Sequence, residues 1–333
     1  MSADGQSVTL TFFVELEGTA LEQLFSDPSV ADHLLALDAH ISLGVVDFSS
    51  ERANVVRQLN QLGIPVVAWQ LLSREEGYWY NMCNAEQAAT RYRAFTEWSA
   101  SENLQWSGIG IDIEPDIGEL QQMFTQKSQL LRTIFKRGCG KKQLHESQEA
   151  YRLLVEQMRS DGYFVQSYEF PFMVDEQQVG STLLHQFFGV AAAPSDQRVL
   201  MLYTSFFRPF GPAFLWSYAR DVDAAGVGIT GGGIEIEGVK HPISLNWEEL
   251  SRDLRLAHRH CGNIHIFSLE GCIEQGFLPQ LREFDWALPV RAPHPWSEIL
   301  YTLRTALKAS LWLVSHPIVL VLALVCIAGL LIY

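Results

Sequence analysis

The residues whose types and spacing best fit chemistry lie in the stretch 106–116. Three isoleucines alternate there with Gly110, Asp112 and Glu114, which is the period-2 pattern of a β-strand that Pro115 must end. Residues two apart on a strand face the same side, so Asp112 and Glu114 point the same way at its C-terminal end. Two neighbouring carboxyls hold their protons with different affinities, which suits general acid catalysis. The alternative is an interior polar Asp112 and a Glu114 that begins a helix.

The elements that must position these carboxyls can be located by periodicity. Strand patterns occur at residues 8–16, 41–48, 64–72, 108–114, 162–169, 198–206, 226–230 and 263–269. Helical patterns separate them, at 21–39, 51–62, 85–102, 117–135, 148–160, 176–187, 212–224, 247–259 and 272–281. This alternation predicts an α/β fold, a (β/α)8 TIM barrel over residues 1–286. A doubly wound sheet is the alternative, but the glycine-rich turn expected after its first strand is missing.

Strand ends of such a barrel converge on one site at its C-terminal face. The predicted catalytic residues are Glu114 and Asp112. The predicted substrate-binding residues at the other strand ends and on the loop after the third strand are Glu15, Asp47, Trp69, Tyr78, Trp79, Gln166, Tyr168, Glu169, Tyr203 and Glu270. Carboxylates bind hydroxyls and protonate leaving oxygens, and aromatic faces stack on pyranose rings. The set therefore predicts a carbohydrate or glycoconjugate ligand.

Metal and phosphate chemistry remain as alternatives. Carboxylates such as Glu15, Glu169 and Glu270 could supply oxygens to magnesium or manganese, whereas no paired histidines support zinc. The run Gly231-Gly-Gly233 fits either a phosphate cradle or a tight turn. The leading prediction includes no metal and no cofactor.

The central strand resembles the signature of family 18 glycoside hydrolases, the chitinase-like barrels, which reads Asp-x-x-Asp-x-Asp-x-Glu. Asp112 and Glu114 match its last two acidic positions, whereas Ser107 and Gly110 stand at the first two. The Met-x-Tyr motif of the family's sixth strand is matched by Met201-Leu-Tyr203. The resemblance implies that Glu114 is the general acid, that Asp112 orients the substrate's acetamido group, and that Tyr203 assists.

Composition limits the possible partners and cross-links. The 333 residues carry a formal net charge of -14 and a pI near 5.1, which argue against nucleic acid. Five cysteines lie at scattered positions without a Cys-x-x-Cys pair, so neither a disulfide framework nor a zinc ribbon is expected.

The C-terminal segment 311–333 contains no Asp, Glu, Lys or Arg. This pattern predicts a transmembrane helix after a linker or juxtamembrane segment at 287–310. Arg291, Arg304 and Lys308 precede it, which predicts a single-pass membrane anchor, lipid contact through that helix and a cytoplasmic globular domain.

The leading hypothesis is therefore a membrane-anchored, glycoside hydrolase-like barrel that acts on a glycan or glycoconjugate. One alternative is a non-catalytic carbohydrate-binding barrel. The other is a metal-dependent isomerase or lyase on the same fold.

Overall fold

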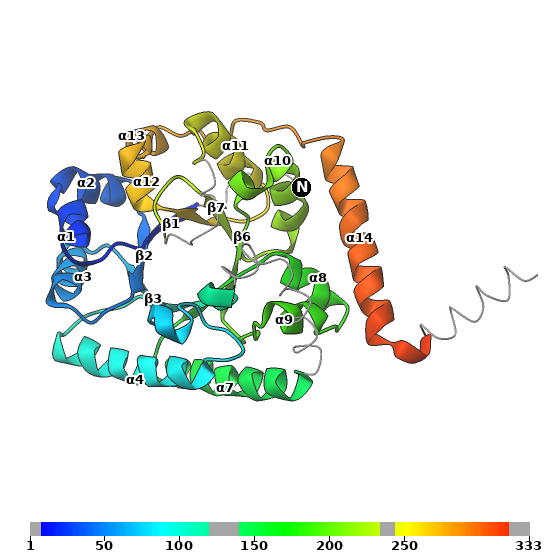
Figure 1. The fold of residues 1–333 in the computed structure, drawn as a ribbon. Coiled ribbons are helices and arrows are strands. Elements are labelled where there is room, and N and C mark those ends of the chain that lie inside the picture. Colours follow the sequence, from blue (N-terminus) through cyan, green and yellow to red (C-terminus); the bar gives the residue numbers. More distant parts are fainter. Residues whose placement is uncertain (1–7, 120–139, 234–243, 320–333) are drawn as a thin grey trace, which may run out of the picture.

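The barrel predicted from the strand pattern is confirmed. The computed structural model describes residues 8–119, 140–233 and 244–319, in which eight parallel strands close in chain order (Figure 1). β1 pairs with β2 (Val14 with Leu43) and closes onto β8 (Phe12 with Ile266). The strands are β1 Thr9–Val14, β2 His40–Val45, β3 Val66–Gln70, β4 Gly108–Ile113, β5 Val165–Glu169, β6 Gln197–Met201, β7 Ala224–Gly228 and β8 Asn263–Phe267.

Helices surround the barrel as the periodicity predicts, with several divided in two. They are α1 Gly18–Ser26, α2 Pro28–Ala36, α3 Ser50–Leu62, α4 Ala85–Ser101, α7 Lys141–Ser160, α8 Phe172–Gln178, α9 Leu183–Phe188, α10 Gly211–Tyr218, α11 Trp247–His258, α12 Leu269–Glu274, α13 Phe277–Arg282 and α14 Trp296–Ser315. The helix predicted at 117–135 lies largely outside the described residues.

The divisions and ends of these helices have local causes. Pro28 occupies the first turn of α2, where its missing N–H costs nothing, and Asp27 caps this helix by accepting from Ser29 N at 2.9 Å. Gly276 separates α12 from α13 with φ 68°, a left-handed conformation that glycine adopts without steric cost.

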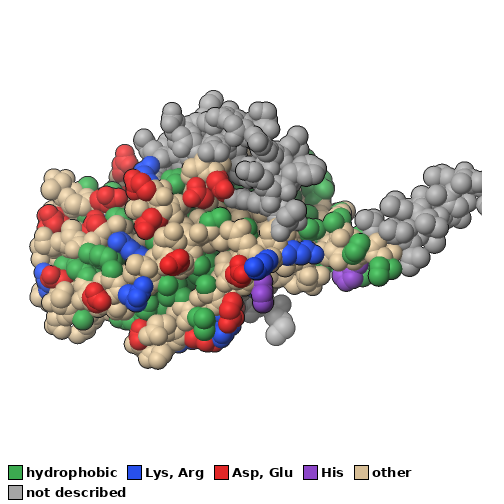
Figure 2. Space-filling view, turned by 60° about the horizontal axis from the view of Figure 1, so that its bottom comes forward, with side chains coloured by type: hydrophobic (Ala, Val, Ile, Leu, Met, Phe, Trp, Pro, Cys, Tyr) green, Lys and Arg blue, Asp and Glu red, His purple; other side chains and the backbone are tan. Residues whose placement is uncertain are grey.

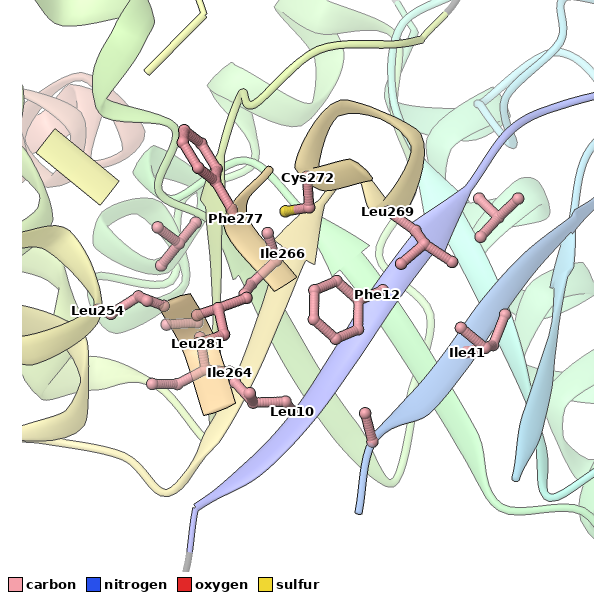
Figure 3. Close-up of a cluster of buried hydrophobic side chains, with 14 of the residues drawn as sticks. Leu10, Phe12, Ile41, Leu254, Ile264, Ile266, Leu269, Cys272, Phe277 and Leu281 are labelled. Atoms are coloured by element: carbon pink, nitrogen blue, oxygen red, sulfur yellow. The ribbon is translucent and has the colours of Figure 1, made fainter. Parts of the chain in front are cut away.

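The main hydrophobic layer lies between the strands and the helices. Phe12, Ile264 and Ile266 are fully buried and face α11 to α13, where Leu254, Phe277 and Leu281 meet them (Figure 3). Each such side chain contributes roughly 1.5–3 kcal/mol relative to an exposed one. This layer fixes the strands, and hence the positions of the side chains at their C-terminal ends.

α14 packs alongside α10 and α8, outside the ring of barrel helices (Figure 1). Ser297, Arg304 and Leu311 are its buried residues. In the space-filling view, acidic and basic side chains are interspersed over one face of the molecule (Figure 2).

The prediction of a membrane span at 311–333 is corrected. α14 ends at Ser315, two residues before Pro317, and residues 320–333 lie outside the described part of the chain. Within that described part, every helix is too short or too polar to cross a membrane. The predicted anchor, lipid contact and membrane localisation all rested on that span and are corrected with it.

Candidate active site at the barrel mouth

Asp112 and Glu114 meet at the end of β4, on the face that points into the barrel. Asp112 is only 3% exposed, and its Oδ2 accepts from Trp69 Nε1 at 3.2 Å. The two carboxyls are close enough to share a hydrogen bond. Burial, followed by the charge of Glu15, raises the pKa of Glu114 to about 8. Burial and the charges of Glu114 and Glu15 also raise the pKa of Asp112 well above its ordinary value, so this pair retains a proton at neutral pH.

Glu15 follows β1 and faces the same pair. Its Oε1 accepts from the Tyr78 hydroxyl at 2.7 Å. Burial raises the pKa of Tyr78 far above its usual range, and the charge of Glu15 adds to that rise. The phenol therefore stays protonated and acts as a donor to Glu15.

The loop after β3 brings Tyr78 and Trp79 over the mouth. Leu72 N donates to Tyr78 O and Tyr80 N donates to Asp112 O, both at 2.8 Å. The side-chain amide of Asn84 donates to Trp79 O at 2.8 Å and thereby holds the loop closed on itself. The rings of Tyr78 and Trp79 meet edge to face at 5.4 Å, and each residue is at most 5% exposed. This loop supplies an aromatic wall beside the carboxyls.

Glu270 lies at the end of β8, opposite β4 in the closed strand order. Both of its carboxyl oxygens are buried, and no described residue offers them a hydrogen bond. Burial raises the pKa of Glu270 to about 7; Ser268 Oγ and nearby backbone N–H groups moderate the rise without reaching hydrogen-bonding geometry. Glu270 therefore titrates close to neutral pH.

The glycine run after β7 packs against Glu270. A Cβ atom at Gly232 would lie 2.7 Å from Ser268 Oγ and in direct contact with Glu270, and the φ of Gly232 is 73°. Only glycine fits this position. A phosphate would meet a carboxyl here, so the structure favours the tight-turn explanation of the run.

Aromatic side chains fill the barrel below the carboxyls. Phe13 contacts Trp69 at 5.2 Å, Tyr168 at 4.8 Å and Phe267 at 5.8 Å between ring centroids. The Tyr168 hydroxyl shares a 2.7 Å hydrogen bond with Ser42 Oγ. The carboxyls consequently lie above an apolar floor, and this floor removes water from beneath them.

Tyr203 completes the mouth from the end of β6. Its ring packs against Phe267 at 5.9 Å. Burial, and then the charges of Asp112, Glu114 and Glu15, raise the pKa of Tyr203 well above its ordinary value. Its hydroxyl therefore stays protonated beside three carboxyls.

The structure places three other predicted site residues elsewhere. Asp47 pairs with Arg52 at 2.9 Å; burial alone would raise the pKa of Asp47, but hydrogen bonds from Arg52 and Ser49 lower it to about 2. Glu169 pairs in register with the outward-facing Ile113, and its Oε1 accepts from the Ser167 hydroxyl at 2.7 Å. Gln166 donates to Gln197 Oε1 at 2.9 Å.

The aromatic floor below the carboxyls was only partly predicted from the sequence. Phe13 and Phe267 were not among the predicted site residues, although the signal was present in the alternation. Phe13 is two residues before Glu15 and Phe267 two after His265, so each shares the inward face of its strand.

The described residues include no group of three or more His, Cys, Asp or Glu side chains placed to hold a metal ion.

Comparisons with known proteins find similarity of fold. No family model and no curated protein matches the sequence. A D-allulose 3-epimerase from Methylomonas sp. is 11% identical, covering 93% of this chain and 99% of that one with a TM-score of 0.43. A xylose isomerase-like TIM barrel protein from Mycobacterium smegmatis in complex with magnesium is 11% identical, covering 85% and 98% with a TM-score of 0.42. A D-psicose 3-epimerase from Clostridium cellulolyticum H10 with D-tagatose is 10% identical, covering 91% and 99% with a TM-score of 0.38.

The predicted resemblance to family 18 glycoside hydrolases is wrong, and the chitinase-like hydrolase prediction is corrected with it. No family model matches, and the three structures described above are sugar epimerases and a xylose isomerase-like barrel. The resemblance rested on Asp112, Glu114 and the short segment ending at Tyr203. Any barrel with carboxyls and a tyrosine at its strand ends can share so few positions.

Proposed function

We propose that the barrel mouth binds a neutral sugar or polyol and catalyses proton transfer at a carbon next to a carbonyl group, as an isomerase or epimerase does. The observation that carries this proposal is the pair of acid–base centres on opposite sides of the mouth, Asp112–Glu114 on β4 and Glu270 after β8. A base that removes a proton from carbon works best with a pKa near the working pH. Both centres titrate close to neutrality.

The proton balance of this step follows from the charge states. With one proton shared, the Asp112–Glu114 pair carries one negative charge and can accept the proton of the substrate carbon. The protonated fraction of Glu270 then delivers a proton to the carbon from the other side, so the pair gains the proton that Glu270 loses. Exchange with water, or turnover in the reverse direction, restores both centres.

The oxyanion formed in between needs a donor. The Tyr203 hydroxyl beside the carboxyls is protonated and can donate to that oxygen. The raised pKa values of Asp112, Glu114 and Glu270 also keep negative charge low at the mouth. An anionic intermediate is therefore easier to form there than it would be if these three carboxyls were all ionised beside Glu15.

The carboxyls support a sugar as the substrate, because they accept hydrogen bonds from its hydroxyls. Tyr78 and Trp79 are at most 5% exposed, so their rings pack beside the carboxyls and exclude water from them. The predicted substrate-binding roles of Glu15, Trp69 and Tyr203 are retained in this proposal.

The test is hydrogen exchange at carbon. The full chain would be incubated in deuterium oxide with a panel of ketohexoses, ketopentoses and the matching aldoses, and proton NMR would follow both loss of C–H signals and new sugars. Glu114→Gln should lower the exchange rate by roughly 10²–10⁴-fold. Glu169→Gln is the matched control, because Glu169 is a buried carboxyl that faces away from the mouth.

Each result has a defined meaning. Exchange that survives Glu114→Gln would refute the acid–base assignment. Saturable sugar binding without exchange would instead indicate the non-catalytic carbohydrate-binding barrel. Parallel assays with a chelator and with added magnesium or manganese distinguish a metal-dependent isomerase from this proposal. Hydrogen exchange catalysed by the carboxyls alone should have the same rate under both conditions.

A further inference from the structure

A cavity of about 380 Å³ lies between the C-terminal end of α10 and the face of α14, on the outside of the barrel. It is separate from the mouth, which is built from the ends of β1, β3, β4, β6 and β8. Its lining includes Trp216, Arg220, Ser297, Tyr301 and Lys308. Cavities of this volume accommodate small organic molecules.

The floor of this cavity is a buried charge network that is already satisfied. Arg304 Nη2 lies 2.8 Å from Asp175 Oδ1 and 2.7 Å from Asp221 Oδ2. The guanidinium also lies 3.7 Å above the Tyr218 ring, and the Tyr218 hydroxyl donates to Asp175 at 2.7 Å. Arg304 on α14 therefore links α8 and α10, and its single positive charge lies between two carboxylates.

The walls contain cations that this network does not use. Arg220 and Lys308 form no ion pair with a carboxylate among the described residues; Arg220 lies over the Trp216 ring at 5.4 Å, and Lys308 donates to the neutral Gln178 side chain at 3.1 Å. Glu298 also lines the cavity, and its carboxylate lies 3.7 Å from His294 Nδ1. The positive charges of Arg220 and Lys308 are thus available to an anion.

A buried hydroxyl gives independent support for a ligand. Ser297 is 5% exposed, lines the cavity, and its Oγ has no hydrogen-bond partner among the described residues. An unsatisfied buried hydroxyl costs about 1–3 kcal/mol, so a partner inside the cavity is expected. Trp216 and Tyr301 add two aromatic rings to the same lining.

We infer that this cavity binds a small aromatic oxyanion from solution, such as an aryl phosphate or aryl carboxylate. Arg220 and Lys308 would bind the oxyanion, Ser297 would donate to or accept from it, and the ligand ring would pack against Trp216 and Tyr301. Charge-assisted hydrogen bonds to such groups are among the stronger polar contacts in proteins.

The experiment is a calorimetric titration of the full chain with phenyl phosphate, with inorganic phosphate and benzyl alcohol as partial ligands. Phenyl phosphate should bind most tightly, because only it offers both the charge and the ring. The double variant Arg220→Gln/Lys308→Gln should lose at least tenfold in affinity, and Ser297→Ala should lose severalfold. The double variant Lys141→Gln/Lys142→Gln on α7 removes two cations away from the cavity and should bind normally.

Glu114→Gln should also bind phenyl phosphate normally, which separates this site from the barrel mouth. Absence of saturable heat with phenyl phosphate, in a protein whose thermal unfolding is cooperative, would overturn the inference. So would equal affinity of the wild type and the Arg220→Gln/Lys308→Gln variant.

Discussion

The shared proton of Asp112 and Glu114 predicts how the stability of the barrel depends on pH. Folding raises the pKa of Glu114 from an ordinary 4.5 to about 8. The folded-state pKa lies above the unfolded one, so stability is full below pH 4.5 and is lost as the pH rises towards 8. Each pH unit within that window costs about 1.4 kcal/mol per proton. Between pH 5.5 and 8 the loss is on the order of 2–3 kcal/mol, or about 3–5 °C in Tm for a chain of this length.

The substitution Glu114→Gln should remove this contribution and leave that of Glu270, whose pKa is also raised. An amide at this position cannot ionise, and its N–H can donate to an ionised Asp112. Thermal unfolding followed by circular dichroism from pH 5.5 to 8 should therefore show a flatter curve for the variant than for the wild type. Glu149→Gln, which removes an exposed carboxyl on α7, should keep the wild-type slope. Parallel curves for wild type and Glu114→Gln would refute the claim that this buried pair holds a proton.

The remaining predictions test the other parts of the site and the fold. Glu270→Gln should lower carbon–hydrogen exchange by at least tenfold and remove the titration near pH 7 from the pH–rate profile; an unchanged profile would exclude Glu270 as the second centre. Gly110→Ala should destabilise the protein by roughly 2–4 kcal/mol in urea unfolding, because the new Cβ would lie 2.7 Å from Tyr168 Cζ and displace that ring. Arg304→Met should cost about 3–5 kcal/mol by leaving Asp175 buried without a cation. Adding Asp175→Asn should recover much of that loss, and no recovery would mean that the pair does not act as a unit.

The barrel could be predicted because each strand carries a local signal. Ile109, Ile111 and Ile113 alternate with smaller or polar residues, and Pro115 sets the end of β4. The same alternation correctly places Asp112 and Glu114 on one face. The divisions within helices could also be anticipated where a breaker is present, as at Pro28, the first residue of α2.

Face assignment was harder where polar residues are consecutive. Gln166, Tyr168 and Glu169 were all predicted to line the site, yet neighbouring strand residues must face opposite sides. The register pairs Tyr168 with the inward Asp112 and Glu169 with the outward Ile113. When both faces of a strand carry polar residues, the sequence alone does not show which set of alternate residues faces the barrel interior.

Ion pairs between residues far apart in the chain could not be predicted from the sequence. Arg304 was interpreted as a basic flank of a membrane span, whereas it is 8% exposed and paired with Asp175, 129 positions earlier in the chain. Asp47 differs, because its partner Arg52 is five residues away and Ser49 begins a helix between them. That local pattern predicts a structural ion pair as readily as a site residue.

The floor of the barrel determines what the acids at its mouth can do. Glu149 is exposed on α7, and the hydrogen bond from Arg152 lowers its pKa. Glu114 is the same residue type, yet burial raises its pKa to about 8. The difference lies in the aromatic rings of Phe13, Trp69 and their neighbours, which remove water from one side of the carboxyls. Substituting floor residues by smaller ones should therefore return the carboxyl pKa values towards their ordinary range even when every acid is kept.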